Sequence, residues 1–150
     1  MGTRPRRFLG IFTFIEPAYF KKESFTFIVT MTQIAIFLIT TLHELISDKP
    51  GCTLYYFGAV NAPSITVYKQ FWRLLTAVFL HANILHICMN AAATFSFGFR
   101  LENVYGTKNL MIIYFVSGIG GSLFVAAFKG AGVGASGALF GLMHMAFYCD

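Results

Sequence analysis

Ser136 is the residue with the clearest potential for covalent chemistry, because small residues surround it in the stretch Gly134-Ala135-Ser136-Gly137. A serine hydroxyl becomes a nucleophile when the backbone presents it clear of neighbours, a base takes its proton and nearby donors stabilise an oxyanion. The glycines allow such a presentation. An apolar helix predicted from Ser136 onward would add backbone N–H groups at its positive end. The tetrapeptide therefore predicts a nucleophile loop at the start of a helix.

A second set of polar side chains lies in an otherwise apolar stretch and consists of His81, His86 and Asn90. His86 and Asn90 are four residues apart, so a helix places them on one face. Such groups within a membrane span are costly and usually face a cavity or a partner. His81 is five residues from His86 and would point elsewhere, so we expect it to make interhelical hydrogen bonds.

The composition indicates a membrane protein, since 57% of the 150 residues are hydrophobic and only 11% are charged. A soluble domain carries about 25% charged residues. The formal net charge of +5 does not indicate a nucleic-acid partner, because the cations are not gathered on one helix face. Many of them precede the first long apolar run, which predicts a cytoplasmic N-terminus. These early cations are Arg4, Arg6, Arg7, Lys21 and Lys22.

The expected architecture is all-α: a polytopic bundle in the lipid bilayer, with a basic cytoplasmic segment at residues 1–24 and a membrane domain at 25–150. A span needs roughly 20 apolar residues. Four apolar stretches qualify or nearly qualify, at about residues 25–46, 77–99, 109–128 and 136–150. The last is cut short by the end of the sequence.

Two connections carry further polar residues. The long, aromatic connection before residue 77 closes with Trp72-Arg73, which could be an interfacial anchor. The turn after the second span contains Glu102 and Gly106, which suit structural contacts and a change of chain direction. Because spans alternate between sides, the long connection and the loop before Ser136 share one membrane face.

Neither a metal nor a cofactor is expected. No carboxylate or third ligand is spaced to complete a metal site with the histidines. Cys52, Cys88 and Cys149 form no Cys-x-x-Cys pair, and we expect them to be packing residues. The Gly-x-Gly-x-x-Gly pattern that ends at Gly137 lacks the preceding strand and the following acid of a dinucleotide site.

In their order and spacing, several motifs between residues 72 and 141 together resemble the rhomboid family of intramembrane serine proteases. These are Trp72-Arg73 with the run to His81, His86-x-x-x-Asn90, Glu102-x-x-x-Gly106 and Gly134-Ala135-Ser136-Gly137.

The resemblance implies a core of six spans with a water-filled active site below one membrane surface. Ser136 would be the nucleophile, in a loop shaped by Gly134 and Gly137. His86, Asn90 and the Ser136 N–H would hold the oxyanion. Trp72 and Arg73 would belong to a membrane-embedded loop, and His81, Glu102 and Gly106 would be structural.

The implied activity is cleavage of the spanning helices of membrane proteins by a Ser-His dyad. The family's base is a histidine on the sixth span, and no matching histidine occurs in these 150 residues. His144 is eight residues beyond Ser136, about 12 Å along a helix, and does not substitute for that base. His86 suits the role of a donor better than that of the base, although the sequence alone leaves the second role open. We therefore expect an inactive fragment of a longer protease. The alternative is a catalytically dead rhomboid-like protein that binds client helices. A transporter would predict repeats or broken helices, and neither is present.

Overall fold

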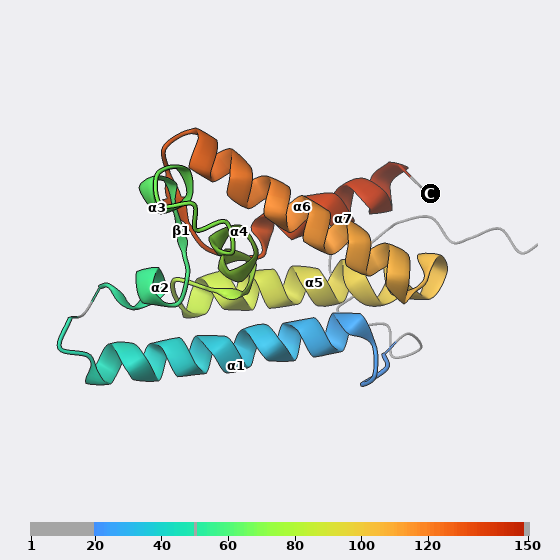
Figure 1. The fold of residues 1–150 in the computed structure, drawn as a ribbon. Helices are drawn as coiled ribbons and strands as arrows, with labels where there is room; N and C mark the ends of the chain where they lie inside the picture. The colour runs from blue at the N-terminus through green and yellow to red at the C-terminus, as the bar shows by residue number, and fades with distance from the viewer. Residues whose placement is uncertain (1–19, 50, 149–150) are drawn as a thin grey trace, which may run out of the picture.

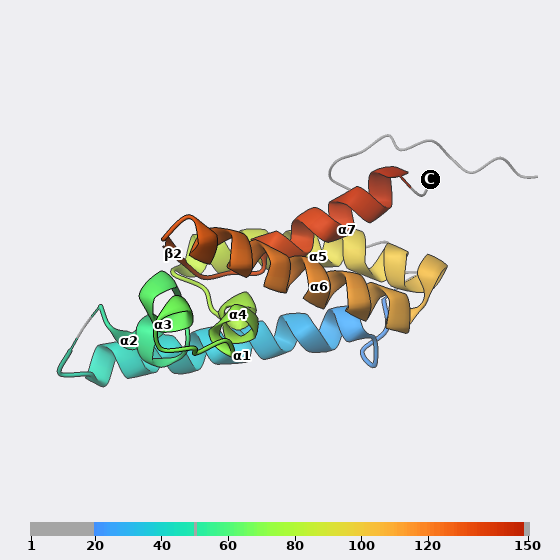
Figure 2. The ribbon, with the colours of Figure 1, turned by 45° about the horizontal axis from the view of Figure 1, so that its top comes forward.

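Long helices make up most of the described chain, which comprises residues 20–49 and 51–148 of a computed structural model. They are α1 (Phe25–Ile46), α5 (Ile84–Tyr105), α6 (Thr107–Ala127) and the shorter α7 (Ser136–Tyr148). Figures 1 and 2 show α1 and α5 side by side, with α6 and α7 packed over α5. The short elements gather near the end of α1 and the start of α5 (Figure 1). These are α2 (Thr53–Tyr56), β1 (Val60–Asn61), α3 (Ala62–Thr66), α4 (Arg73–Thr76), the 3-10 turn η2 (Ala77–Phe79) and β2 (Ala131–Gly132).

Three of the helices are long and apolar enough to cross a bilayer, namely α1 with 22 residues, α5 with 22 and α6 with 21. Helix α7 is also apolar but has only 13 residues. The predicted fold class, an all-α polytopic membrane bundle, is confirmed, and the chain is an integral membrane protein. The predicted basic segment at residues 1–24 lies mostly outside the described residues.

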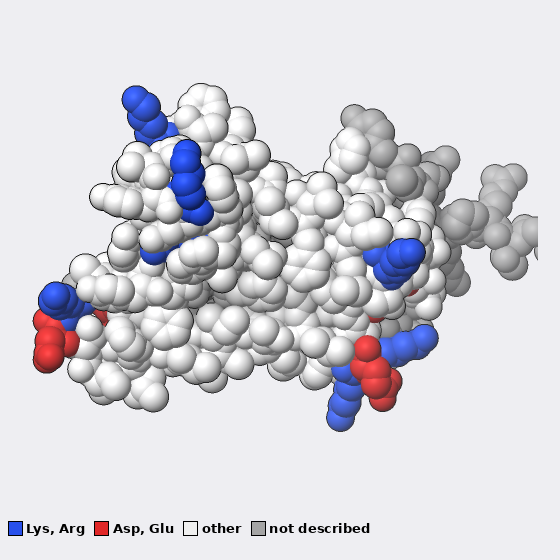
Figure 3. Space-filling model, in the orientation of Figure 1, with Lys and Arg blue, Asp and Glu red and all other residues white. Residues whose placement is uncertain are grey.

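Charged side chains lie near the ends of the long helices. Within the described chain, the face in Figure 3 has a band without Lys, Arg, Asp or Glu between two charged ends. Charged groups at the centre of a bilayer are costly, so this distribution suits helices that run across the membrane. By their positions relative to the helix ends, one end carries Lys21, Lys22, Glu23, Arg100, Glu102 and Lys108, and the other carries Glu44, Asp48, Lys49, Lys69, Arg73 and Lys129.

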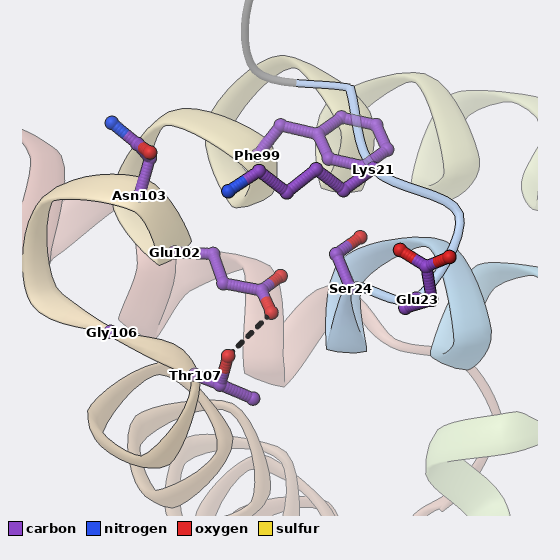
Figure 4. Close-up of a pocket in the computed structure, with 8 residues that line it drawn as sticks. All are labelled: Lys21, Glu23, Ser24, Phe99, Glu102, Asn103, Gly106 and Thr107. Carbon is purple, nitrogen blue, oxygen red and sulfur yellow. Dashed lines mark hydrogen bonds between the residues drawn. The ribbon is translucent and has the colours of Figure 1, made fainter.

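The Glu102 carboxylate ties the start of α1 to the α5–α6 turn. Its Oε1 accepts hydrogen bonds from the Phe25 N–H at 2.8 Å and from the Thr107 hydroxyl at 2.9 Å. Its Oε2 accepts from the Thr26 N–H at 3.0 Å and from the Thr26 hydroxyl at 2.7 Å. Figure 4 shows the carboxylate reaching from α5 toward Thr107 and toward the start of α1 beside Ser24. The first N–H groups of a helix have no hydrogen-bond acceptor within that helix. The Glu102 carboxylate is the acceptor for two of these N–H groups in α1, those of Phe25 and Thr26.

A buried polar contact joins the middle of the bundle. The Gln33 amide in α1 donates to the Tyr114 hydroxyl of α6 at 2.7 Å and to the Val78 carbonyl at 3.3 Å. Gln33 is 1% exposed and Tyr114 is fully buried. Buried polar groups need such partners, so this contact fixes the positions of α1 and α6 against the turn that precedes α5.

Helices α6 and α7 touch through glycine backbones. A Cβ built on Gly121 would lie 2.9 Å from the Gly137 Cα, which is closer than side chains tolerate. Small residues of this kind let membrane helices approach closely. The contact holds the first turn of α7, and with it Ser136, against α6.

The connection between α1 and α5 is organised around a buried arginine. The Arg73 guanidinium donates to the carbonyls of Tyr55 at 2.8 Å and Ala59 at 3.1 Å, and lies 4.4 Å from the centre of the Tyr55 ring. Arg73 Nε donates to Gln70 Oε1 at 2.6 Å. These contacts fold residues 55–73 into a compact cap beside the helix ends. The second spanning helix then begins at Ile84, while residues 77–83 form η2 and a loop.

Two cysteines lie differently from the prediction. Cys52 and Cys88 are free and exposed, so the expectation that they are packing residues was wrong for both. Cys88 shares the outward face of α5 with Met89, which is 65% exposed, and an apolar surface of a membrane helix can face lipid. Cys149 lies outside the described residues.

Candidate active site

Ser136 is the first residue of α7, and its side chain is exposed. The loop before it is held at two points. Strand β2 pairs antiparallel with β1, and the Gly134 N–H donates to the Ala77 carbonyl at 2.8 Å. Gly134 has a φ of +118°, a conformation that side-chain-bearing residues rarely adopt. These anchors place the Ser136 hydroxyl at the positive end of α7.

His86 lies in the first turn of α5 because Asn83 caps that helix. The Asn83 side-chain oxygen accepts from the His86 N–H at 2.9 Å. Asn90 follows one turn further along on the same face and is buried. The Asn90 amide nitrogen donates to the His86 carbonyl at 2.9 Å, which uses one of its two N–H groups.

The His86 ring lies directly against the nucleophile loop. A Cβ on Gly134 would lie 2.7 Å from both Cε1 and Nε2 of the His86 ring, so only a glycine leaves room for the imidazole. The contact brings an imidazole nitrogen close to the backbone two residues before Ser136. The sequence-predicted serine loop and the α5 donor face therefore meet in the structure.

A hollow of about 380 Å³ opens beside Ser136 between α6 and α7. Its walls are mostly small or apolar, and Ser136 and Ser122 are the polar residues among them. A hollow next to a candidate nucleophile is where a reacting group or a further helix could be placed. Besides Ser136, it is lined by Val60, Ala77, Gly118, Gly121, Ser122, Phe124, Val125, Gly132, Val133, Gly134, Gly137 and Phe140.

The other predicted site residues lie outside this centre. Trp72 is half exposed at the start of α4, where its ring contacts the Arg73 guanidinium at 4.7 Å. Glu102 and Gly106 lie at the opposite end of α5, and Gly106, with a φ of +81°, joins α5 to α6. Gly137, by contrast, directly follows Ser136, lines the same hollow and contacts Gly121 as described. Trp72, Glu102 and Gly106 shape the bundle and its connections away from the serine loop.

His81 is the site residue whose surroundings the sequence did not predict. It is 1% exposed, and neither ring nitrogen hydrogen-bonds to any described residue, so the expected interhelical hydrogen bond is not seen there. Its ring instead meets His86 edge to face, with centroids 5.1 Å apart and planes at 68°. A helix through both residues would separate them, but α5 begins only at Ile84, and the loop before it brings His81 back toward His86.

Burial lowers the pKa of His81 to about 4, helped by the neighbouring His86 and partly opposed by the Phe79 carbonyl. Desolvation penalises the charged form, so His81 is neutral near pH 7. A neutral imidazole has one N–H and one nitrogen lone pair. His81 can thus donate one hydrogen bond and accept another.

In the described part of the chain, no group of three or more His, Cys, Asp or Glu side chains could hold a metal ion. The groups at the serine loop are a hydroxyl, an imidazole and the first N–H groups of a helix, and the Asn90 carboxamide lies one helix turn from that imidazole. Such a set suits acyl transfer, in which a serine attacks a carbonyl and donors hold the oxyanion.

Gly134→Ala is expected to displace His86 from the serine loop, because the new methyl group would overlap the imidazole and the positive φ would be strained. We expect a loss of stability of about 1–3 kcal/mol, measured by unfolding in detergent micelles. Gly120→Ala is the matched control, since a Cβ at Gly120 meets nothing within 4 Å. A Gly134→Ala protein as stable as the Gly120→Ala protein would contradict the contact.

The fold and the site together define a class, that of helical membrane proteins with a candidate serine centre between the ends of their helices. Sequence comparison makes the class specific, because the Rhomboid domain matches residues 68–149 of this chain. The chain belongs to the rhomboid family. The matched residues include every candidate site residue from Trp72 to Gly137.

Individual relatives agree with this assignment. RHOMBOID-like protein 6, mitochondrial, of Arabidopsis thaliana is 45% identical over 93 residues, which cover 61% of this chain and 30% of that protein. Rhomboid-like protease 3 of Toxoplasma gondii is 36% identical over 117 residues, which cover 77% of this chain and 44% of that protein. Rhomboid protease GluP of Bacillus subtilis (strain 168) is 34% identical over 136 residues, which cover 89% of this chain and 26% of that protein. The chain thus spans less than half the length of each of these relatives.

Proposed function

We propose that this chain carries the nucleophile and the oxyanion donors of an intramembrane serine endopeptidase that cuts the spanning helices of membrane proteins. The observation that carries the proposal is the contact of the His86 ring with the loop that presents Ser136 at the start of α7. Two of its relatives are named as proteases, Rhomboid-like protease 3 and Rhomboid protease GluP.

In the proposed reaction, the Ser136 hydroxyl attacks the carbonyl carbon of the substrate peptide bond and loses its proton to a base. His86, the free N–H of Asn90 and the Ser136 N–H stabilise the oxyanion. The C–N bond then breaks, the base returns the proton to the leaving amine, and water hydrolyses the acyl-enzyme. No cofactor takes part in these steps.

The base is proposed to come from outside these 150 residues. Of the four histidines, His86 is proposed as a donor to the oxyanion, and the ring of His81 packs against that of His86. His43 is engaged with Thr53 near the end of α1, at 2.9 Å. His144 lies two turns along α7 from Ser136, about 12 Å at 1.5 Å per residue. None of them suits the role of a base at Ser136.

The hollow beside Ser136 offers a place for a helix that carries the base. It is lined by small and apolar residues of α6 and α7, the kind of surface against which a further membrane helix packs. A histidine on such a helix could reach Ser136 through this hollow, which His86 does not line. We accordingly propose that the 150 residues alone are inactive and that the natural gene product containing them is the enzyme.

The N-terminus is proposed to be cytoplasmic, with Ser136 toward the opposite membrane face. The described charges favour neither orientation, because each end of the bundle carries four Lys or Arg and two Asp or Glu residues. Support comes from Arg4, Arg6 and Arg7, which precede α1 and fit the bias of cytoplasmic segments toward positive charge.

Cleavage of a single-span membrane protein tests the proposal. The natural gene product, expressed with such a substrate in bacterial membranes, is expected to release a shorter product, and Ser136→Ala is expected to abolish it. Ser96→Ala is the control, because Ser96 lies on the exposed side of α5 and, among the described residues, its hydroxyl donates to the Ala92 carbonyl of its own helix. Substrate binding without cleavage would instead support a catalytically dead rhomboid-like protein that binds client helices.

A further inference from the structure

His81 is buried, and neither of its ring nitrogens makes a well-formed hydrogen bond to a described residue, although the nearby Phe79 carbonyl raises its pKa slightly against the effect of burial. Leaving a buried donor or acceptor unsatisfied is costly, and each such group in a folded protein requires an explanation. An apolar residue of similar size would avoid this cost. The chain nevertheless places an imidazole here, against the ring of His86.

The two rings are complementary in their hydrogen-bonding groups. His86 turns its Cε1–Nε2 edge toward Gly134, and its Nδ1 lies farther away, at 3.8 Å from the position of a Gly134 Cβ compared with 2.7 Å for Nε2. If Nε2 is to donate to an oxyanion at Ser136, the proton of the neutral ring must be on Nε2. Nδ1 then has a lone pair that needs a donor.

His81 is placed to be that donor. The two ring centroids are 5.1 Å apart. Imidazoles joined by an N–H···N bond of about 3 Å have their centres roughly 5 Å apart. The separation therefore suits a hydrogen bond, which requires the rings to turn about χ2 from their edge-to-face arrangement.

We propose that His81 is a positioning residue that donates a hydrogen bond to His86 Nδ1 and thereby keeps the His86 proton on Nε2, facing the Ser136 loop. The hydrogen bond at one nitrogen of an imidazole sets the protonation of the other. The low pKa of His81 is consistent with this role, because a neutral His81 donates without adding charge beside His86. The benefit to catalysis rests on the proposed function, whereas the hydrogen bond itself does not.

Nuclear magnetic resonance of the ¹⁵N-histidine-labelled chain in detergent micelles tests the proposal without any cleavage. The four histidines are assigned by single substitutions. The expected result is a scalar coupling across the hydrogen bond between a His81 N–H and His86 Nδ1, with His86 Nδ1 unprotonated and Nε2 protonated. A missing coupling together with a protonated His86 Nδ1 would overturn the proposal. The protease function would survive that outcome, since the measurement needs neither base nor substrate.

Variants sharpen the test. His81→Phe keeps a ring but removes the donor, and is expected to change the His86 tautomer ratio on the order of fivefold. His81→Gln retains an N–H donor and should restore part of the ratio. His43→Phe is the control, because His43 bonds to Thr53 away from the site. An unchanged ratio in His81→Phe contradicts the proposal, and should that variant not fold, the coupling in the unsubstituted chain decides.

Discussion

His86→Ala in the natural gene product is expected to lower kcat by about 10²–10³, with a much smaller change in KM. Removal of one oxyanion donor typically has an effect of this size, because the donor acts on charge that develops only in the transition state. The structure supports a direct role, since the His86 ring adjoins Gly134 in the serine loop. Initial-rate kinetics with a fluorogenic transmembrane peptide would measure both constants.

Asn90→Ala is expected to act in the same direction. It has a close control in Asn109→Ala, because both amide nitrogens donate to a carbonyl four residues earlier at 2.9 Å. Asn109 is exposed in α6, near the opposite end of the bundle, so its loss should leave kcat unchanged. Equal effects of the two substitutions would show that Asn90 contributes only its local helix contact, and an unchanged kcat in His86→Ala would remove His86 from the oxyanion site.

The largest effect on stability is expected at Glu102, where Glu102→Gln should destabilise the bundle by about 3 kcal/mol. Each carboxylate oxygen accepts two hydrogen bonds, from Phe25 and Thr107 at Oε1 and from the N–H and hydroxyl of Thr26 at Oε2. Glutamine must therefore direct its NH₂ group at a backbone N–H of α1, whichever way the amide turns. Donor would face donor, and one or more N–H groups would lose their partner.

Unfolding of the variant chains by SDS titration from micelles would measure this loss. Asn103→Ala is the control, because Asn103 is the exposed neighbour of Glu102 beside the same pocket (Figure 4). We expect its effect to stay within about 0.5 kcal/mol. Glu102→Gln with an effect as small as that of Asn103→Ala would mean that α1 does not depend on this carboxylate.

The sequence was most informative where periodicity and length decide the structure. Apolar runs long enough for a bilayer predicted the positions of α1 and α6 closely. The four-residue spacing of His86 and Asn90 predicted a shared helix face, and the glycines around Ser136 predicted a turn into a helix. Each of these predictions depends on local geometry, which a sequence displays directly.

The connection between α1 and α5 could not be predicted in the same way. Its two-residue strand β1 pairs with β2 across about 70 residues, and so short a pairing has no periodic pattern. The buried Arg73 is held mainly by backbone carbonyls, which leave no mark in the sequence. The sequence analysis assumed a helix from residue 77, which would hold the rings of His81 and His86 apart. Because α5 begins only at Ile84, His81 lies in the loop before it, and that loop brings the two rings into contact.

The most direct test of the central claim is to locate the nucleophile with a fluorophosphonate probe. The natural gene product is treated with the probe in micelles, and the modified peptide is identified by mass spectrometry. We predict an adduct on the Ser136 hydroxyl that is absent from Ser136→Ala, unchanged in Ser96→Ala and strongly reduced in His86→Ala. An adduct on another residue, or equal labelling of the Ser136→Ala protein, would contradict the account of Ser136 as the nucleophile.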